Sequence, residues 1–407
     1  MVMSAFQFTG TPAIHFGSGM VEKLVDLLPK GTRRVLFVMG GFQRTNAEPW
    51  SRIASKLEEA GIGYETVHIH HEPTVEWVDE VVDRYRSDGY GHDGRDGLAI
   101  DAVVAIGGGS AMDAGKAVSA MLTTDAGDTI LHYLEGQPAY RAHGGSKVFF
   151  VAIPTTSGTG SEMTKNAVIS ISGGFKRSLR HDRFIPDAAI VDARLTVSCP
   201  VAVKAASGLD ALTQLIESYV STKASPLTDA LALSGIEAAA SSLMQICTTA
   251  AEDEPLHEQM AYASMLSGIT LAHAGLGLVH GFASPLGGQF PIPHGVICGT
   301  LLAEVTKRNI EAMTAASINS SAAQRGLAKY AAVGSILTGH DKQDTEGCLS
   351  RLVEILESWT EQLAITRLGA YGVHAGNIDN VIEASDNKQS PVQLDKTVMR
   401  DILLARL

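Results

Sequence analysis

Hydrophobic and polar positions follow a repeating pattern in the first half of the chain. Apolar, β-branched runs such as RRVLFVMGG (33–41) and DAVVAIGGG (101–109) have the length of buried strands. Between them, AEPWSRIASKLEEAGI (47–62) places apolar residues at helical spacing. Two further strands (63–70, 148–156) and two further helices (75–87, 110–123) are predicted in the same way. This alternation predicts crossover units and a parallel sheet.

The pattern changes near residue 199. Four long segments carry helical spacing and few β-branched clusters, at 199–221, 225–250, 256–277 and 345–365. A chain of 407 residues also exceeds one ordinary core. We therefore predict an α/β domain over 1–198 and an all-helical domain over 199–407. The polar, glycine-rich segment 87–97 is interpreted as a surface insertion.

Composition narrows the class of protein. The net charge is −12 and the 32 Lys and Arg are scattered, which argues against a nucleic-acid partner. The longest apolar runs have strand length, and the start MVMSAFQFTGTP lacks the features of a signal peptide, so no membrane association is expected. Four cysteines stand far apart without a CxxC pair, which fits buried thiols in a cytoplasmic protein.

Three glycines follow the predicted strand at 101–107. Gly107, Gly108 and Gly109 precede a helix expected to open at about Ser110. Glycines let the backbone close on a phosphate, and a helix N-terminus offers free N–H groups. Asp113 is expected in the first helical turn, where a carboxylate could simply cap. A plain strand-to-helix turn remains the alternative, because the spacing is not GxGxxG.

Two other strand ends carry candidate cofactor residues. In dinucleotide folds an acidic residue after an early strand binds the ribose hydroxyls and repels a 2′-phosphate. Here Gly40 and Gly41 stand there, with Arg44 close behind, which favours NADP over NAD; a plain turn with a solvated Arg44 is the alternative. The segment IPTTSGTGSEMTKNAVI (153–169) concentrates hydroxyls that could bind ribose, phosphate or carboxamide, although an ordinary polar loop is the alternative.

Metal-ligand residue types occur in the helical half. Asp210 and Gln214 lie one helical turn apart in GLDALTQLIES, a spacing that could hold a metal ion if both side chains ligate. His280 and His294 lie in the glycine- and proline-rich stretch 275–299. Together with Asp210 they form a plausible set of nitrogen and oxygen donors.

Six motifs in order make this chain similar to the iron-dependent (group III) alcohol dehydrogenases. They are GGGSAMDAGKA, IPTTSGTGSE, PDAAIVDARLT, GLDALTQLIESYVS, SPLTDALAL and GLGLVHGFASPLGG…IPHG. The resemblance implies a Rossmann-like α/β domain, a C-terminal helical domain of the dehydroquinate synthase-like kind, and an active site in the cleft between them. It also implies reversible hydride transfer between NAD(P) and an alcohol or aldehyde.

Carried over residue by residue, the resemblance assigns two sets of positions. The family's four metal ligands fall at Asp210, Gln214, His280 and His294, with Fe(II) or Zn(II) as the expected ion. The family's NAD-selective aspartate falls at Gly40, which again favours NADP. The cofactor positions are Gly107, Gly108, Gly109, Ser110, Thr155, Thr159, Thr164, Asn166 and Lys176, and Asp113 and Thr156 join them as candidates from the residue pattern.

Two positions depart from the family pattern. Gln214 replaces the second ligand, a histidine, and Ser284 replaces the proton-relay histidine. A metal site with Gln214 as a weak fourth ligand is preferred, and a metal-free reductase like the maleylacetate reductases is the alternative. Ser284, a water chain or the cofactor ribose would carry the proton.

Three functional classes remain in competition. The favoured one is a metal-assisted alcohol dehydrogenase or aldehyde reductase. A glycerol dehydrogenase or dehydroquinate synthase-like enzyme is the second, and a binding protein with a lost active site is the third. SAFQFTG (4–10) is interpreted as an edge strand, and a homodimer is expected to cover it. The basic segment 173–186 is interpreted chiefly as a solvated strand pair.

Overall fold

The computed structural model describes residues 5–41, 47–86, 99–171, 175–318 and 320–407. The chain forms two compact units, which are considered separately below. One comprises 9–156 and 160–199, and the other comprises 1–8, 157–159 and 200–407. Arg44 and the whole of the proposed surface insertion lie outside the described residues.

The first unit contains the predicted parallel sheet. Its six strands run in the order β1-β8-β5-β4-β2-β3, and every neighbouring pair is parallel. The strands are β1 (Ala13–Phe16), β2 (Arg34–Met39), β3 (Gly63–His68), β4 (Ala102–Gly107), β5 (Phe149–Pro154) and β8 (Ala188–Val191). Near-continuous burial of β2, β4 and β5 explains why these segments read as uninterrupted apolar runs.

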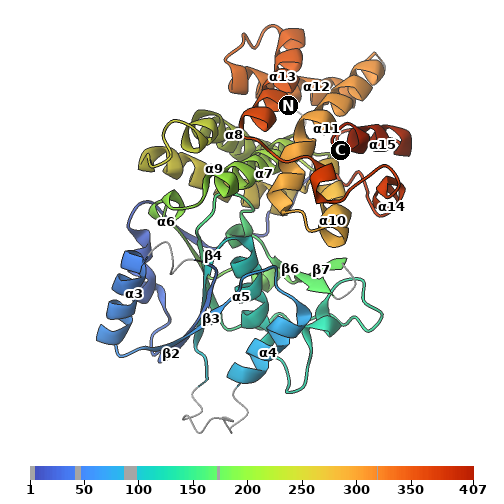
Figure 1. Ribbon diagram of the computed structural model, residues 1–407. Coiled ribbons are helices and arrows are strands. Elements are labelled where there is room, and N and C mark those ends of the chain that lie inside the picture. Colours follow the sequence, from blue (N-terminus) through green and yellow to red (C-terminus); the bar gives the residue numbers. More distant parts are fainter. Residues whose placement is uncertain (1–4, 42–46, 87–98, 172–174, 319) are drawn as a thin grey trace. The chain divides into compact units, whose positions relative to one another are not determined.

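Helices cover both faces of this sheet. Figure 1 shows α3 (Ala47–Glu59) on one face, and α4 (Val75–Tyr85) and α5 (Gly109–Met121) on the other. Successive residues of β2 contribute to opposite cores: Val35 and Phe37 pack on the α3 side, and Leu36 and Val38 on the α5 side. The two-residue period of a strand and two helical layers together account for this core.

Shorter elements complete the first unit. β6 (Asn166–Ile171) and β7 (Phe175–Arg180) form an antiparallel pair, so the basic segment 173–186 supplies one strand of a pair whose other strand precedes it. Lys176 pairs with Glu72 at 2.6 Å, and Arg180 pairs with Glu135 at 3.5 Å. The remaining short elements are η1 (Met20–Lys23), α1 (Leu24–Leu27), η2 (Ile130–Tyr133), η3 (Ser161–Met163), η4 (Asp182–Phe184) and α6 (Arg194–Val197).

The second unit is helical, as the sequence pattern predicts. Its main helices are α7 (Val201–Val220), α8 (Pro226–Cys247), α9 (Glu254–Ala274), α10 (Leu278–Gln289), α11 (His294–Ala316), α12 (Ser321–Thr338) and α13 (Thr345–Gln362). Three short helices follow: η5 (Leu368–Tyr371), α14 (Ile378–Glu383) and α15 (Lys396–Leu404). Helix α7 is buried over most of its length, which positions its polar side chains inside the unit.

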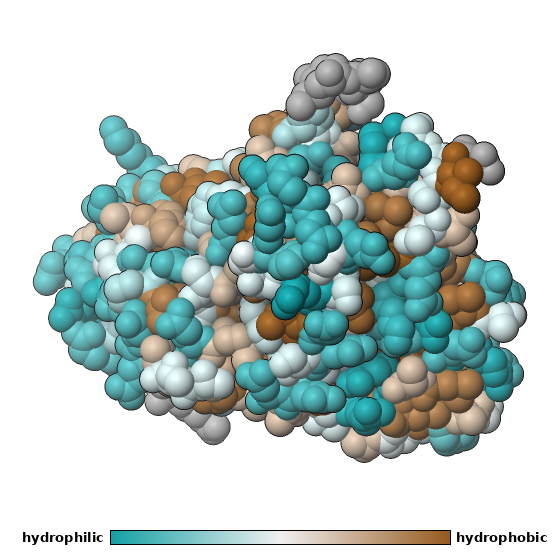
Figure 2. Space-filling view, turned by 90° about the horizontal axis from the view of Figure 1, so that it is seen from above, coloured by the Kyte–Doolittle hydropathy of each residue, from teal (hydrophilic) through white to brown (hydrophobic). Residues whose placement is uncertain are grey.

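The surface and helix α8 are relevant to the prediction that the protein does not associate with a membrane. Figure 2 shows a largely hydrophilic face with separate hydrophobic areas. Among the described residues, α8 is long and apolar enough for a membrane span by length and composition, but it packs against α7 and α9. A buried core helix passes the same length and composition test, so this single helix is weak evidence for a span.

The prediction of an edge strand at 4–10 is wrong for the described part of that segment. Residues 5–10 form no strand, and the sheet edge is β1 instead. The ring of Phe8 stacks on His273 of α9 with centroids 3.8 Å apart. Residues 5–8 group with the helical unit and do not extend the sheet.

Candidate functional site

The predicted cofactor residues of the first unit meet at the carboxyl ends of β2, β4 and β5. Gly40 N donates to Ile106 O at 3.0 Å, and Thr155 N donates to Gly107 O at 2.9 Å. A Cβ at Gly107 would lie 2.7 Å from Ala111 Cβ, so only glycine fits there. A crevice outside the carboxyl ends of parallel strands is where doubly wound folds bind nucleotides.

The N-terminus of α5 faces the same edge. Gly108 is its N-cap and provides no side-chain cap, so the first backbone N–H groups of Gly109 and Ser110 are not used by a capping residue. Thr156 Oγ1 would lie 3.3 Å from a Cβ at Gly108, which places this hydroxyl beside the turn. Gly41 follows Gly40 at the end of β2. The arrangement suits a phosphate group.

The suggestion that Asp113 caps the first turn of α5 is wrong. The helix begins at Gly109, so Asp113 lies in the second turn and is half-buried. Its Oδ1 accepts from Ser161 Oγ at 2.6 Å and its Oδ2 accepts from Val168 N at 3.1 Å. Burial raises the pKa of Asp113. Its carboxylate therefore ties the hydroxyl-rich loop and β6 to the helix.

Lys116, which sequence reasoning missed, holds the same loop from inside. Its Nζ donates to Thr164 Oγ1 at 3.0 Å, to Asn166 O at 2.8 Å and to Ser161 O at 3.0 Å. Burial lowers the pKa of Lys116 to about 8 and raises that of Glu162 to about 7. The signal in the sequence was a charged pair three residues apart in an otherwise apolar helix.

Two predicted cofactor residues, Lys176 and Thr159, have other contacts within the protein. Lys176 is engaged by Glu72 on the strand pair. Thr159 belongs to a short stretch that packs with the helical unit. In that stretch a Cβ at Gly158 would lie 2.6 Å from Ser207 Cβ, so glycine allows the loop to approach α7 closely.

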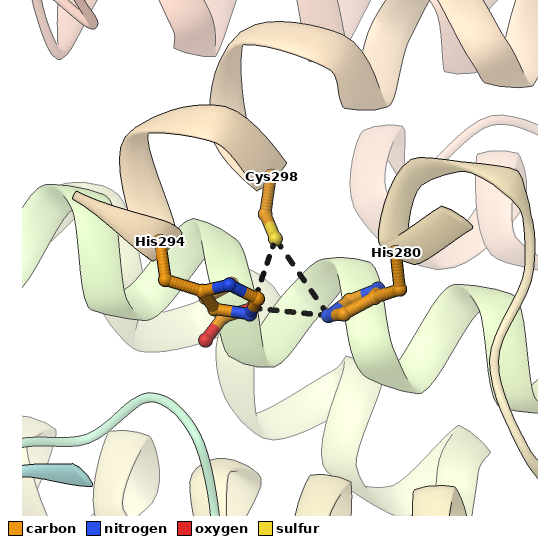
Figure 3. Close-up of side chains that lie close together, drawn as sticks. His280, His294 and Cys298 are labelled. Atoms are coloured by element: carbon orange, nitrogen blue, oxygen red, sulfur yellow. Dashed lines mark hydrogen bonds and ion pairs between the residues drawn. The ribbon is translucent and has the colours of Figure 1, made fainter. Parts of the chain in front are cut away.

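The helical unit brings together the predicted aspartate and both predicted histidines. Asp210 Oδ1 lies 3.3 Å from His280 Nε2 and 3.6 Å from His294 Nε2. They come from three helices, α7, α10 and α11, so the site exists only once the unit folds. Figure 3 shows the rings of His280 and His294 converging below Cys298. Among the described residues these four form a group whose ligand atoms all lie within 4.8 Å of one another.

Glu217 orients His280. Its Oε2 lies 2.7 Å from His280 Nδ1, and its Oε1 accepts from Val279 N at 2.7 Å. When Nδ1 carries the hydrogen, Nε2 of neutral His280 keeps a lone pair directed at the Asp210 carboxylate. A carboxylate behind a metal-ligating imidazole is a recurring outer-shell arrangement. Glu217 stands two helical turns after Asp210, a spacing from which the sequence could have indicated it.

The electrostatics of the group require a cation. Asp210 Oδ1 is buried and accepts no hydrogen bond of good geometry from the described residues; the ring nitrogens of His280 and His294 face it at 3.3 and 3.6 Å. Burial raises the pKa of Asp210, but the imidazoles of His294 and His280 outweigh it and lower that pKa overall. Burial lowers the pKa of His280, yet Cys298, Asp210 and Glu217 together raise it well above 6.5. A proton or a metal ion is therefore needed between these donors.

Gln214, Ser284 and Cys298 lie near these donors but have different environments. Gln214 is buried, and its Oε1 accepts from Ser267 Oγ at 2.8 Å. Ser284 is exposed, one turn after His280 on α10. Cys298, which the sequence analysis treated as one of four buried thiols, lies in the donor group, and burial raises its pKa to about 12. Its spacing from His294, one helical turn, was the signal available in the sequence.

A parallel sheet with a glycine-lined carboxyl edge, and a helical unit with a buried aspartate and two histidines, are the features of an NAD(P)-dependent oxidoreductase with a candidate metal site. The chain belongs to the iron-containing alcohol dehydrogenase family. The family model "Iron-containing alcohol dehydrogenase" matches residues 11–193, and the model for the "Fe-containing alcohol dehydrogenase family, C-terminal" matches 204–406. The resemblance stated from the sequence motifs is confirmed.

Individual relatives cover almost the whole chain. Long-chain-alcohol dehydrogenase 1 of Geobacillus thermodenitrificans is 31% identical over 392 residues, covering 93% of this chain and 90% of its own length. The NADPH-dependent butanol dehydrogenase of Clostridium saccharobutylicum is 29% identical and covers 97% and 96%. A crystal structure of a 1,3-propanediol oxidoreductase superposes with a TM-score of 0.84 at 26% identity, covering 99% of this chain and 100% of that one. The fold class and the alcohol dehydrogenase or aldehyde reductase activity are thus confirmed.

Proposed function

We propose that this enzyme reduces an aldehyde with NADPH, reversibly, and that a divalent metal, Fe(II) or Zn(II), is held by Asp210, His280 and His294. The buried oxygen of Asp210, facing two ring nitrogens without a hydrogen bond, carries this proposal. Such an oxygen is costly to bury unless a cation completes it. A carboxylate with two imidazoles suits either metal.

A bound metal supplies Lewis-acid polarisation of the substrate oxygen. The chain's own residues then have distinct tasks. Glu217 fixes the ring of His280 and directs its Nε2 into the group. Gln214 is a neutral donor one turn after Asp210; we treat it as a weaker ligand candidate, because its oxygen accepts from Ser267.

Proton delivery is proposed for Ser284. It is exposed and stands one turn beyond His280, at the position where the family has its relay histidine. A serine hydroxyl passes a proton only by relaying it from water, since it does not titrate near neutral pH. A Ser284→His variant should gain a pH-dependent step in the rate profile; an unchanged profile would count against this role.

NADPH is proposed over NADH because β2 ends at Gly40 rather than at a carboxylate. An acid there would repel the 2′-phosphate of NADP. The glycine edge formed by Gly40, Gly107 and Gly108, with Thr155 and Thr156 beside it, supports binding of the pyrophosphate. For Ser110, Thr159, Thr164, Asn166 and Lys176 the cofactor contacts inferred from the resemblance remain proposals.

The decisive experiment is metal analysis of anaerobically purified protein, followed by an aldehyde panel monitored as NADPH oxidation. About one metal ion per chain is expected, with loss of activity on chelation and recovery on adding Fe(II) or Zn(II). Asp210→Asn should lose the metal, and Asp229→Asn on α8 should retain it. Full activity without metal would support the metal-free reductase. Product without net NADPH consumption would support the dehydroquinate synthase-like class, and binding of neither cofactor nor metal would support a binding protein.

A homodimer and a cytoplasmic location complete the proposal. β1 is an edge strand of the sheet, and Ile14 in it is 38% exposed, so a second copy could cover this edge. None of the four cysteines forms a disulfide in the described residues, which fits a reducing compartment. Light scattering coupled to size exclusion would test the dimer, and a monomer at micromolar concentration would refute it.

A further inference from the structure

The donor group contains a sulfur atom that the family assignment does not include. Cys298 Sγ lies 3.6 Å from His280 Nε2 and 3.7 Å from His294 Nε2. His294 and Cys298 stand four residues apart on α11, so both side chains point to the same side of that helix. In Figure 3 the sulfur lies above the two facing imidazoles.

These separations match those between ligands around one tetrahedral ion. Zn–N and Zn–O bonds of about 2.0–2.1 Å and a Zn–S bond of about 2.3 Å place nitrogen and oxygen ligands about 3.3 Å apart, and sulfur and nitrogen ligands about 3.6 Å apart. The observed oxygen–nitrogen distances from Asp210 are 3.3 and 3.6 Å, and the sulfur–nitrogen distances are 3.6 and 3.7 Å. Four of the six separations among these donors therefore match a tetrahedral ion, and all four ligand atoms lie within 4.8 Å of one another.

The alternative fourth donor is engaged elsewhere. Gln214 Oε1 accepts from Ser267 Oγ at 2.8 Å, whereas Asp210 Oδ1 is buried, without a hydrogen bond, among the donors. A neutral amide is also a weaker ligand for Zn(II) than a thiolate, and thiolate donors favour Zn(II). One carboxylate and one thiolate would neutralise a divalent ion, which lowers the cost of burying it.

We propose that the Cys298 thiolate is a fourth protein ligand of the divalent metal at this cluster, in place of Gln214. The inference rests on the proposed metal site. On binding, the S–H bond of Cys298 breaks, its proton passes to the buffer and the sulfur lone pair forms the bond to the metal, with no change of oxidation state. The protein ligands are then an aspartate, two histidines and a cysteine, a set that favours Zn(II) over Fe(II), and a substrate oxygen would have to enter as a fifth ligand.

The test is anaerobic loading of the apoprotein with Co(II). The wild type should show an intense near-ultraviolet thiolate-to-Co(II) charge-transfer band. Cys298→Ser should lack this band and bind Zn(II) at least tenfold more weakly than the wild type. Cys348→Ser, a second buried cysteine on α13, and Gln214→Ala should both retain the band. Their Zn(II) affinities should stay within about threefold of the wild type.

The possible failures are distinguishable. A wild-type protein that binds Co(II) without the thiolate band overturns the inference and leaves the metal function standing. So does a Cys298→Ser variant with unchanged affinity, or a Gln214→Ala variant that loses affinity while Cys298→Ser does not. A wild-type protein that binds neither Co(II) nor Zn(II) overturns the proposed metal function itself.

Discussion

Replacing Glu217 by glutamine tests whether the metal group depends on an outer carboxylate. The carboxylate accepts two hydrogen bonds of 2.7 Å, one from His280 Nδ1 and one from Val279 N. A glutamine has one acceptor oxygen and one NH₂ donor at the same positions. The donor must therefore face either the Val279 N–H or His280 Nδ1. In the second case the hydrogen of His280 moves to Nε2, which then cannot bind a metal.

The magnitude follows from the loss of one buried, charged hydrogen bond. Such a bond contributes about 1.5–3 kcal/mol, which corresponds to a loss of about 10–150-fold in metal affinity. Removing an outer-shell carboxylate behind a metal-bound histidine typically lowers the metal affinity about 10–100-fold. The two estimates agree, so Glu217→Gln should weaken Zn(II) binding by one to two orders of magnitude.

Competition with a chromophoric chelator measures this affinity directly. Glu304→Gln is a matched control, because Glu304 is a carboxylate on α11 of the same unit that pairs with Arg308 at 2.9 Å. The control should bind Zn(II) as the wild type does. Thermal melts of the metal-free proteins show whether the unit remains folded. A folded Glu217→Gln protein with unchanged Zn(II) affinity would refute the reasoning.

Three further changes address the cofactor edge, helix packing and pH dependence. Gly40→Asp fits sterically, since its Cβ would lie 3.6 Å from the nearest atom, Gly107 Cα, and should lower the NADPH-to-NADH ratio of kcat/KM about 10–100-fold; an unchanged ratio would contradict it. Gly281→Ala would place its Cβ 1.9 Å from Asp386 O, so α10 must shift. The variant should lose about 1–3 kcal/mol of unfolding free energy and lose the metal. A denaturant midpoint equal to that of the wild type would contradict this. Burial raises the pKa of Glu162 from 4.5 to about 7, so its stabilising contribution is full below about pH 4.5 and is lost as the pH rises to about 7. The resulting decrease in unfolding free energy between about pH 4.5 and pH 7, about 3 kcal/mol in total, should vanish in Glu162→Gln. Chemical denaturation at several pH values measures it.

Local pattern was sufficient for most of the fold. Strands β2, β4 and β5 are uninterrupted apolar runs ended by glycine or proline, and α3 and α4 have one apolar face, so their type follows from short-range spacing. The predictions that were wrong depended on tertiary contacts or on the precise start of a helix. Residues 5–10 alternate like a strand, but Phe8 packs on His273 instead. Asp113 was expected in a first turn because the helix start could not be placed to within a residue or two from the sequence.

The chemistry-bearing residues divide in the same way. The sequence by itself determined the family, the glycine turn after β4, and the candidate roles of Asp210, His280 and His294, because each depends on residue type and chain order. The tertiary structure decided which donor atoms lie close enough together to bind one ion. Helical spacing placed Glu217 on the face of Asp210 and Cys298 on the face of His294, but only the packing of α7, α10 and α11 brings these faces together into one group. The same packing engages Gln214 with Ser267 of α9, a contact between residues 53 positions apart.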